Sequence, residues 1–95
     1  MASVLVDTDV FIDHLRGSTE LVAGKHRLSY SVITRAELFA GNSATNACAT
    51  LLAPFKEIRV SRAIAERAGR VPRACGLRLL VALIVATALD GGLSL

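Results

Sequence analysis

The apolar residues of the 95-residue chain recur with two periodicities, one typical of strands and one typical of helices. Short β-branched or alternating runs predict strands, and apolar residues spaced three or four apart predict amphipathic helices. Small polar residues and glycines mark several helix ends, such as a cap at Ser31 and a stop at Gly41. The expected strands are 3–6, 26–31 and 56–60, with another beginning at 93–95, and the expected helices are 9–17, 18–23, 31–41, 42–53, 61–71 and 77–92.

Strands that alternate with helices predict one α/β domain over residues 1–95, built around a parallel sheet. In such folds the functional polar side chains gather outside the carboxyl ends of the strands. Asp7 directly follows the first expected strand and therefore lies at such an end. The strand expected at 93–95 is very short and has little to pair with, so we expect an incomplete sheet.

Three carboxylates, Asp7, Asp9 and Asp13, cluster after the first apolar run. Like charges beside a core repel one another and resist desolvation, and a bound cation is an effective compensating partner. Asp7 is the best candidate for a metal ligand or nucleophile, the alternative being a simple helix cap. We expect Asp9 to be the cap or an auxiliary ligand, and Asp13 to be a surface charge. Glu37 lies in an apolar helix, where its carboxylate either joins a narrow polar stripe or points into a cation pocket.

The composition adds two expectations about partners. Hydrophobic residues make up 53% of the chain and aromatic residues 4%, so the surplus of aliphatic surface indicates a second copy or another protein. The net charge of +3 is uneven, because residues 59–95 carry six arginines against Glu66 and Asp90. Arginine binds phosphate bidentately, although a solvated helix face is the simpler alternative. The candidate phosphate contacts are Arg59, Arg62, Arg70 and Arg73.

The cysteines and the apolar runs bear on the compartment. Cys48 and Cys75 form no C-x-x-C pair, and they read as reduced, buried residues. The N-terminus lacks the basic region of a signal peptide, and the longest apolar run, 79–89, is too short to span a bilayer. We therefore expect a cytoplasmic protein with no membrane segment.

The segments VLVDTDVFIDHLRG (4–17) and LSYSVITRAELFAG (28–41) together resemble the PIN-domain ribonucleases. The likeness is to the toxin of bacterial type II toxin–antitoxin pairs of the VapBC kind. GLRLLVALIVATALDGGLSL (76–95) resembles the last helix of that family and the turn into its next strand. The resemblance implies a three-layer α/β/α fold and a Mg²⁺- or Mn²⁺-dependent endoribonuclease. It also implies three partners: an RNA substrate, a cognate antitoxin and a second copy of the chain.

The resemblance also implies a site. In that family a strand-end Asp, a helix Glu and further Asp residues hold one or two hard cations, which prefer oxygen ligands. By position, Asp7 matches the first ligand and Glu37 the second, with Asp9 as an additional candidate. Thr8 matches a hydroxyl that supports the first Asp or a metal-bound water. The metal would activate water for attack on an RNA phosphodiester, while the arginines named above contact RNA phosphates.

Two features depart from the family pattern. Family members have an Asp in the last helix at the position of Val81, and a valine offers the cation no ligand. The chain also ends at Leu95, before the further strand and polar residue of the family, so we expect the C-terminal portion of the fold to be missing. Both features predict impaired activity. The alternative is a catalytically dead remnant that only binds an antitoxin or dimerises.

The opening motif supports one further alternative. VLVDTDV also fits the D-x-D signature of haloacid-dehalogenase phosphatases, in which the first Asp is a nucleophile and the second a general acid. That fold requires a later lysine and an acidic pair. Lys25 and Lys56 lie in plain surroundings and no Asp-Asp pair exists, so a phosphatase is a minor alternative.

Overall fold

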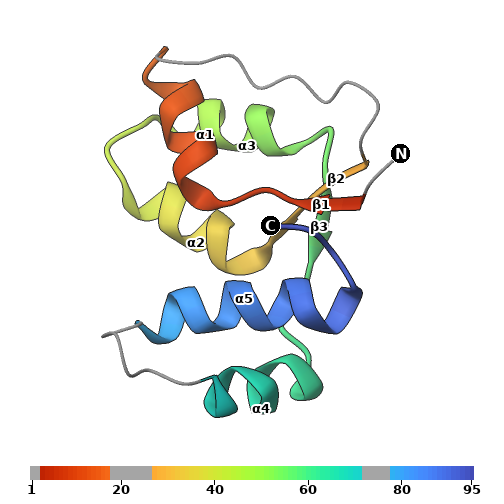
Figure 1. Cartoon of the computed structure of the whole chain (residues 1–95). Coiled ribbons are helices and arrows are strands. Elements are labelled where there is room, and N and C mark those ends of the chain that lie inside the picture. Colours follow the sequence, from red (N-terminus) through yellow and green to blue (C-terminus); the bar gives the residue numbers. More distant parts are fainter. Residues whose placement is uncertain (1–2, 18–26, 72–77) are drawn as a thin grey trace.

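Eight secondary-structure elements form in the part of the chain that the computed structural model describes, residues 3–17, 27–71 and 78–95. Strands and helices alternate along the chain, as the hydrophobic pattern predicts (Figure 1). In chain order the elements are β1 (Ser3–Leu5), α1 (Thr8–Leu15), β2 (Arg27–Ser31), α2 (Val32–Ala40), α3 (Thr45–Leu52), β3 (Lys56–Ile58), α4 (Arg62–Arg70) and α5 (Leu79–Gly91).

The three strands form a parallel sheet in the order β1-β2-β3. A single parallel bridge from Val4 to Ser94 continues the sheet on the other side of β1. Its hydrogen bonds run from Leu5 N to Ser94 O (2.6 Å) and from Ser94 N to Ser3 O (3.0 Å). The strand expected at 93–95 is thus reduced to one bridge to β1, in line with the expected incomplete sheet. This bridge gives β1 a neighbour on both edges.

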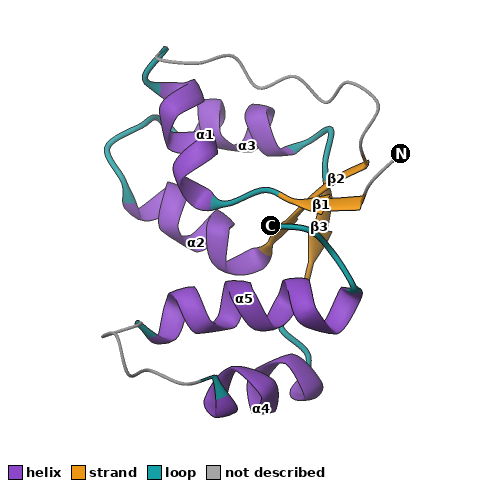
Figure 2. Cartoon of the chain, viewed as in Figure 1, coloured by secondary structure: helices purple, strands orange, loops and turns teal. Residues whose placement is uncertain are grey.

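Helices lie on both faces of the sheet (Figure 2), and buried side chains build a core on each face. Val6 and Tyr30 pack with α1, α2 and α3, whereas Leu5 packs with α5. Helix α4 covers the outer side of α5. The predicted three-layer α/β/α arrangement around a parallel sheet is confirmed. The buried residues of the three clusters are Val6, Phe11, Tyr30, Leu38, Cys48 and Leu52; Leu5, Ile84 and Ala88; and Ile64, Ala68, Ala82 and Ala86.

Most predicted helix ends are confirmed by the hydrogen bonds of their caps. Ser31 accepts a hydrogen bond from Ile33 N (3.1 Å) at the start of α2, and α2 ends before Gly41. Ser61 accepts one from Ile64 N (3.1 Å) at the start of α4. Gly92 ends α5 in the left-handed conformation, with φ of 63°, which glycine adopts without steric cost.

The helix expected over 42–53 begins only at Thr45, and its cap residue Ala44 makes no side-chain hydrogen bond. Residues 41–44 instead form a separate connection after α2. Cys48 is buried, as predicted, and its Sγ donates to Leu38 O (3.6 Å). The helix expected over 18–23 and Cys75 lie outside the described residues. No helix within the described ranges is long and apolar enough to cross a membrane.

A polar cluster joins β2, α2 and β3 at the edge of the first core. The buried Tyr30 hydroxyl donates to Glu57 Oε1 (3.0 Å) and accepts from Arg35 Nη2 (2.9 Å). Arg35 Nε also donates to Glu57 Oε1 and completes an ion pair. The hydrogen bond from Arg35 lowers the pKa of the Glu57 carboxyl below its ordinary value, and burial raises the pKa of the Tyr30 phenol.

This cluster predicts an acid-sensitive part of the stability. Because the folded-state pKa of Glu57 is lowered, its contribution is present above the ordinary glutamate pKa of about 4.3 and is lost as the pH falls through the folded value. Glu57→Gln should lower the free energy of unfolding at neutral pH by about 0.5 kcal/mol, since the pair is partly exposed. It should also reduce the further loss on acidification. Urea unfolding across a pH series measures both.

The matched control is Glu66→Gln, which removes a carboxylate from the exposed face of α4. It should leave the acid-dependent loss close to that of the unmodified protein. If Glu57→Gln lost as much unfolding free energy on acidification as the unmodified protein, Glu57 would not be the source of the acid sensitivity.

Candidate metal centre

Asp7 lies where the chain passes from β1 into α1. Its backbone is extended, with φ of −71° and ψ of 151°, and its Oδ1 accepts a hydrogen bond from Thr8 N (2.7 Å). Aspartate is among the preferred N-cap residues, and its charge also interacts favourably with the positive end of the helix dipole. The expectation that Asp9 is the cap was therefore wrong. Asp9 lies exposed in the first turn of α1, and the cap and the candidate ligand are the same residue, Asp7.

Glu37 approaches this point from α2. Thr8 Oγ1 donates to Glu37 Oε1 over 2.7 Å, across 29 positions of sequence. Thr8 Oγ1 also lies 2.9 Å from Thr34 Oγ1, one turn before Glu37 on α2. Thr8 and Thr34 are both buried, whereas Asp7 is exposed and Glu37 is half-buried. Thr8 thus contacts both carboxylates, Asp7 through its backbone nitrogen and Glu37 through its hydroxyl. Its role as a hydroxyl that supports a metal ligand stays a prediction.

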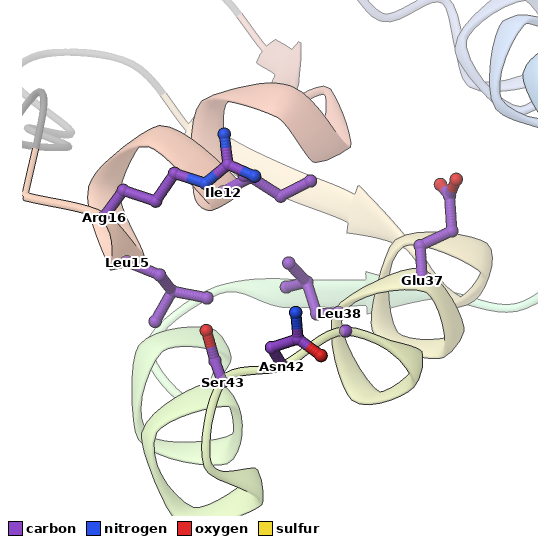
Figure 3. A pocket seen from close by; sticks show the side chains of 8 residues that line it. Ile12, Leu15, Arg16, Glu37, Leu38, Asn42 and Ser43 are labelled. Atoms are coloured by element: carbon purple, nitrogen blue, oxygen red, sulfur yellow. The ribbon is translucent and has the colours of Figure 1, made fainter.

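Glu37 also borders an open pocket of about 320 Å³ between α1 and the end of α2. Figure 3 shows Arg16, from the end of α1, across this pocket from Asn42 and Ser43. Glu37 lies at the edge of this pocket, and Figure 3 shows its carboxylate pointing away from Asn42 and Ser43. That it faces a cation stays a prediction. Apolar side chains contribute the rest of the lining, from Ile12, Leu15 and Leu38.

Each of the two carboxylates has an oxygen that could bind a hard cation. Within the described part of the chain, Asp7 Oδ2 and Glu37 Oε2 have no hydrogen-bond partner, and no described arginine or lysine forms an ion pair with either residue. Arg35, on the same helix as Glu37, is bound to Glu57 instead. Mg²⁺ is commonly held by one or two carboxylates together with water and substrate phosphate, so this donor set fits such an ion.

A larger cage is not formed by the described residues, among which no group of three or more His, Cys, Asp or Glu side chains is placed to hold a metal ion. Asp9 therefore does not join Asp7 and Glu37 in such a group. Asp13 is exposed further along α1, as expected of a surface charge. Val81 lies on the first turn of α5 with 41% of its side chain exposed. It supplies no oxygen ligand.

The predicted phosphate contacts lie away from these carboxylates. Arg62 and Arg70 are exposed at the two ends of α4, and Arg59 is exposed just before it. Figure 1 shows α4 on the far side of α5 from α1, so Arg62 and Arg70 do not line the candidate metal centre. Arg73 lies outside the described residues.

Thr34 is the residue of this site that the sequence interpretation missed. It lies three positions before Glu37, and residues three or four apart share one face of a helix. That spacing is the signal that could have found it.

The cap can be separated from the charge of Asp7 by two substitutions. Asp7→Ala removes both, and we expect it to lower the free energy of unfolding by about 1 kcal/mol. Asp7→Asn keeps a side-chain oxygen for Thr8 N and should lower the free energy of unfolding by less. Urea unfolding measures the difference, with Asp13→Ala as the control on the exposed face of α1. Equal losses in Asp7→Ala and Asp7→Asn would argue against a capping role.

Some solved structures are similar to this chain. No protein-family model matches the sequence, and no curated protein matches it. A chain from a toxin–antitoxin complex of Klebsiella pneumoniae is 30% identical, over 95% of this chain and 81% of that one, with a TM-score of 0.79. A chain from VapBC2 of Rickettsia felis, bound to a DNA fragment from the VapBC2 promoter, is 17% identical. That match covers 98% of this chain and 84% of that one, with a TM-score of 0.72.

These matches confirm a PIN-like α/β fold with a parallel sheet. Because the Klebsiella match reaches 30% identity over most of both chains, the likeness extends beyond fold to family. The chain therefore belongs to the family of that chain of the Klebsiella toxin–antitoxin complex. It shares its fold with the VapBC2 chain, in agreement with the predicted resemblance to VapBC-type toxins.

Proposed function

We propose that this chain is a metal-dependent endoribonuclease toxin that is held in check by a cognate antitoxin. The observation that carries the proposal is the linked pair of carboxylates at the end of β1, Asp7 and Glu37, joined through Thr8. The solved structures to which the chain is similar are toxin–antitoxin complexes, which supports the toxin role and the antitoxin partner.

In this proposal Asp7 and Glu37 hold a Mg²⁺ or Mn²⁺ ion, which supplies water activation and charge neutralisation at the RNA phosphodiester. Thr8 keeps the Glu37 carboxylate in place through Oε1, and its backbone nitrogen does the same for Asp7 through Oδ1. Two carboxylates leave several coordination positions to water and phosphate, so the ion is held weakly until RNA binds.

RNA is retained mainly through its phosphates. Arg59, Arg62 and Arg70 are exposed on or beside α4, and Arg73 follows in the sequence. Contacts of this kind are sensitive to salt and blind to base sequence. Because Arg62 and Arg70 lie on α4, beyond α5 from Asp7, they would hold a distant part of the strand rather than the phosphate that is cut.

A protein partner is supported by the apolar surface at the start of α5, where Leu79, Leu80 and Val81 are 51%, 45% and 41% exposed. Exposed apolar side chains gathered on one helix are typical of surfaces that bind a second copy or another protein. Val81 also supports the second candidate function, an inactive remnant that retains only partner binding. Membership of the toxin family favours both of these functions over the phosphatase alternative.

RNA cleavage by the purified chain tests the enzyme directly. We expect cleavage of single-stranded RNA with Mg²⁺ or Mn²⁺, loss of cleavage with EDTA, and loss in Asp7→Asn and Glu37→Gln, because each variant removes one anionic ligand while keeping a hydrogen-bond acceptor. Gel analysis of labelled RNA measures the rate. Absence of cleavage, combined with a stable complex with the product of an adjacent small open reading frame, would instead establish the remnant.

Val81→Asp tests the ligand that is missing from the last helix. Since Val81 is partly exposed, the substitution should change the free energy of unfolding by no more than about 0.5 kcal/mol. We expect it to strengthen Mn²⁺ binding severalfold and to raise the cleavage rate. Leu80→Asp is the matched control, because it adds the same charge at the adjacent exposed position. Equal gains in Mn²⁺ binding and cleavage rate in the two variants would show that the added negative charge, and not a new ligand, causes them.

A further inference from the structure

We propose that Thr34 is a positioning residue of the metal centre, acting through Thr8 to hold Glu37. The inference rests on the proposed function, because it assumes that Glu37 is a metal ligand. Thr34 contacts neither carboxylate by any hydrogen bond within the described residues. Among the described residues, the side-chain hydrogen bonds connect Thr34 to Glu37 through the Thr8 hydroxyl, which lies 2.9 Å from Thr34 Oγ1.

The direction of the hydrogen bonds follows from counting protons. A threonine hydroxyl has one proton to donate and two lone pairs that accept. Thr8 gives its proton to Glu37 Oε1. The hydrogen bond between Thr8 and Thr34 must then be donated by Thr34, although either oxygen could be the donor on geometry alone. The result is a chain of donors that runs from Thr34 through Thr8 to Glu37.

The surroundings make this chain effective. Thr34 is fully buried and Thr8 is 5% exposed, so water is excluded from the link between them. Hydrogen bonds in a chain polarise one another, and a buried hydroxyl oxygen left without its partner is costly. By donating to Thr8, Thr34 keeps that hydroxyl in one orientation and strengthens its bond to Glu37. Glu37 Oε1 is thereby committed to Thr8, and Oε2 is left for the cation.

Groups that orient a metal ligand contribute to metal affinity without touching the ion. If Thr34 acts only through Thr8, its removal should matter when Thr8 carries a hydroxyl and should not matter when Thr8 has none. A simple packing role for Thr34 predicts the opposite, namely equal effects in both backgrounds. This difference is what a double-mutant cycle measures.

The experiment is a titration of the full chain with Mn²⁺ in a calorimeter, which measures the affinity for the ion. We expect Thr8→Val to weaken Mn²⁺ binding about tenfold and Thr34→Val to weaken it severalfold. The double variant should bind Mn²⁺ as Thr8→Val does. Thr34→Ser, which keeps the hydroxyl, should restore binding to within about twofold of the unmodified protein.

Thr87→Val is the matched control. Thr87 is also buried on a helix, and its hydroxyl donates to Leu83 O (2.7 Å) within α5, with no link to Glu37. Thr87→Val should leave Mn²⁺ affinity unchanged, even where it lowers the melting temperature as much as Thr34→Val does. If Thr34→Val does not fold, Thr34→Ala replaces it in the same cycle.

Two results would overturn the inference while leaving the proposed function intact. One is unchanged Mn²⁺ affinity in Thr34→Val, and the other is a loss that adds in full to that of Thr8→Val. A third result is distinct from these. If the unmodified chain binds Mn²⁺ no better than Glu37→Gln, the metal centre itself fails, and the role of Thr34 fails with it.

Discussion

One buried hydroxyl, that of Thr8, connects the two halves of the candidate site. The backbone nitrogen of Thr8 donates to Asp7 at the start of α1, and the Thr8 hydroxyl donates to Glu37 on α2. Neither carboxylate belongs to the sheet: Asp7 caps α1 and Glu37 lies on α2, and β2 separates these two helices in the chain. The contact between Thr8 and Glu37 is therefore what turns two separate acidic residues into one site.

The core on either side of the sheet sets the conditions for that contact. Val6, two residues before Thr8, and Phe11, three residues after it, are both buried, so packing holds the chain on either side of Thr8. Leu38, next to Glu37, is buried in the same cluster. Apolar burial thus fixes the backbone positions, and the hydroxyls of Thr8 and Thr34 set the finer orientation of the Glu37 carboxylate.

The described arginines and lysines leave Asp7 and Glu37 without an ion pair, although Arg16 lines the pocket that Glu37 borders. Arg35 is close in sequence to Glu37, yet it lies beside Tyr30 and Glu57 and stacks its guanidinium 5.7 Å from the centre of the Phe39 ring. Arg62 and Arg70 are on α4, beyond α5. Because no described arginine or lysine pairs with Asp7 or Glu37, an external cation remains the simplest partner for the two carboxylates.

The sequence by itself determined the order and type of the elements, the α/β class and the caps at Ser31 and Ser61, because these depend on local periodicity and on side chains within one turn. It also identified Asp7 and Glu37 as candidates. Local signals misassigned the cap of α1 to Asp9 and began α3 too early, since the competing choices differ by only a few residues. Only the tertiary structure decided that Ser94 pairs with β1 and that Thr34, Thr8 and Glu37 form one chain of hydrogen bonds. Those contacts join residues far apart in sequence, and their geometry is set by packing across the sheet, which no local pattern encodes.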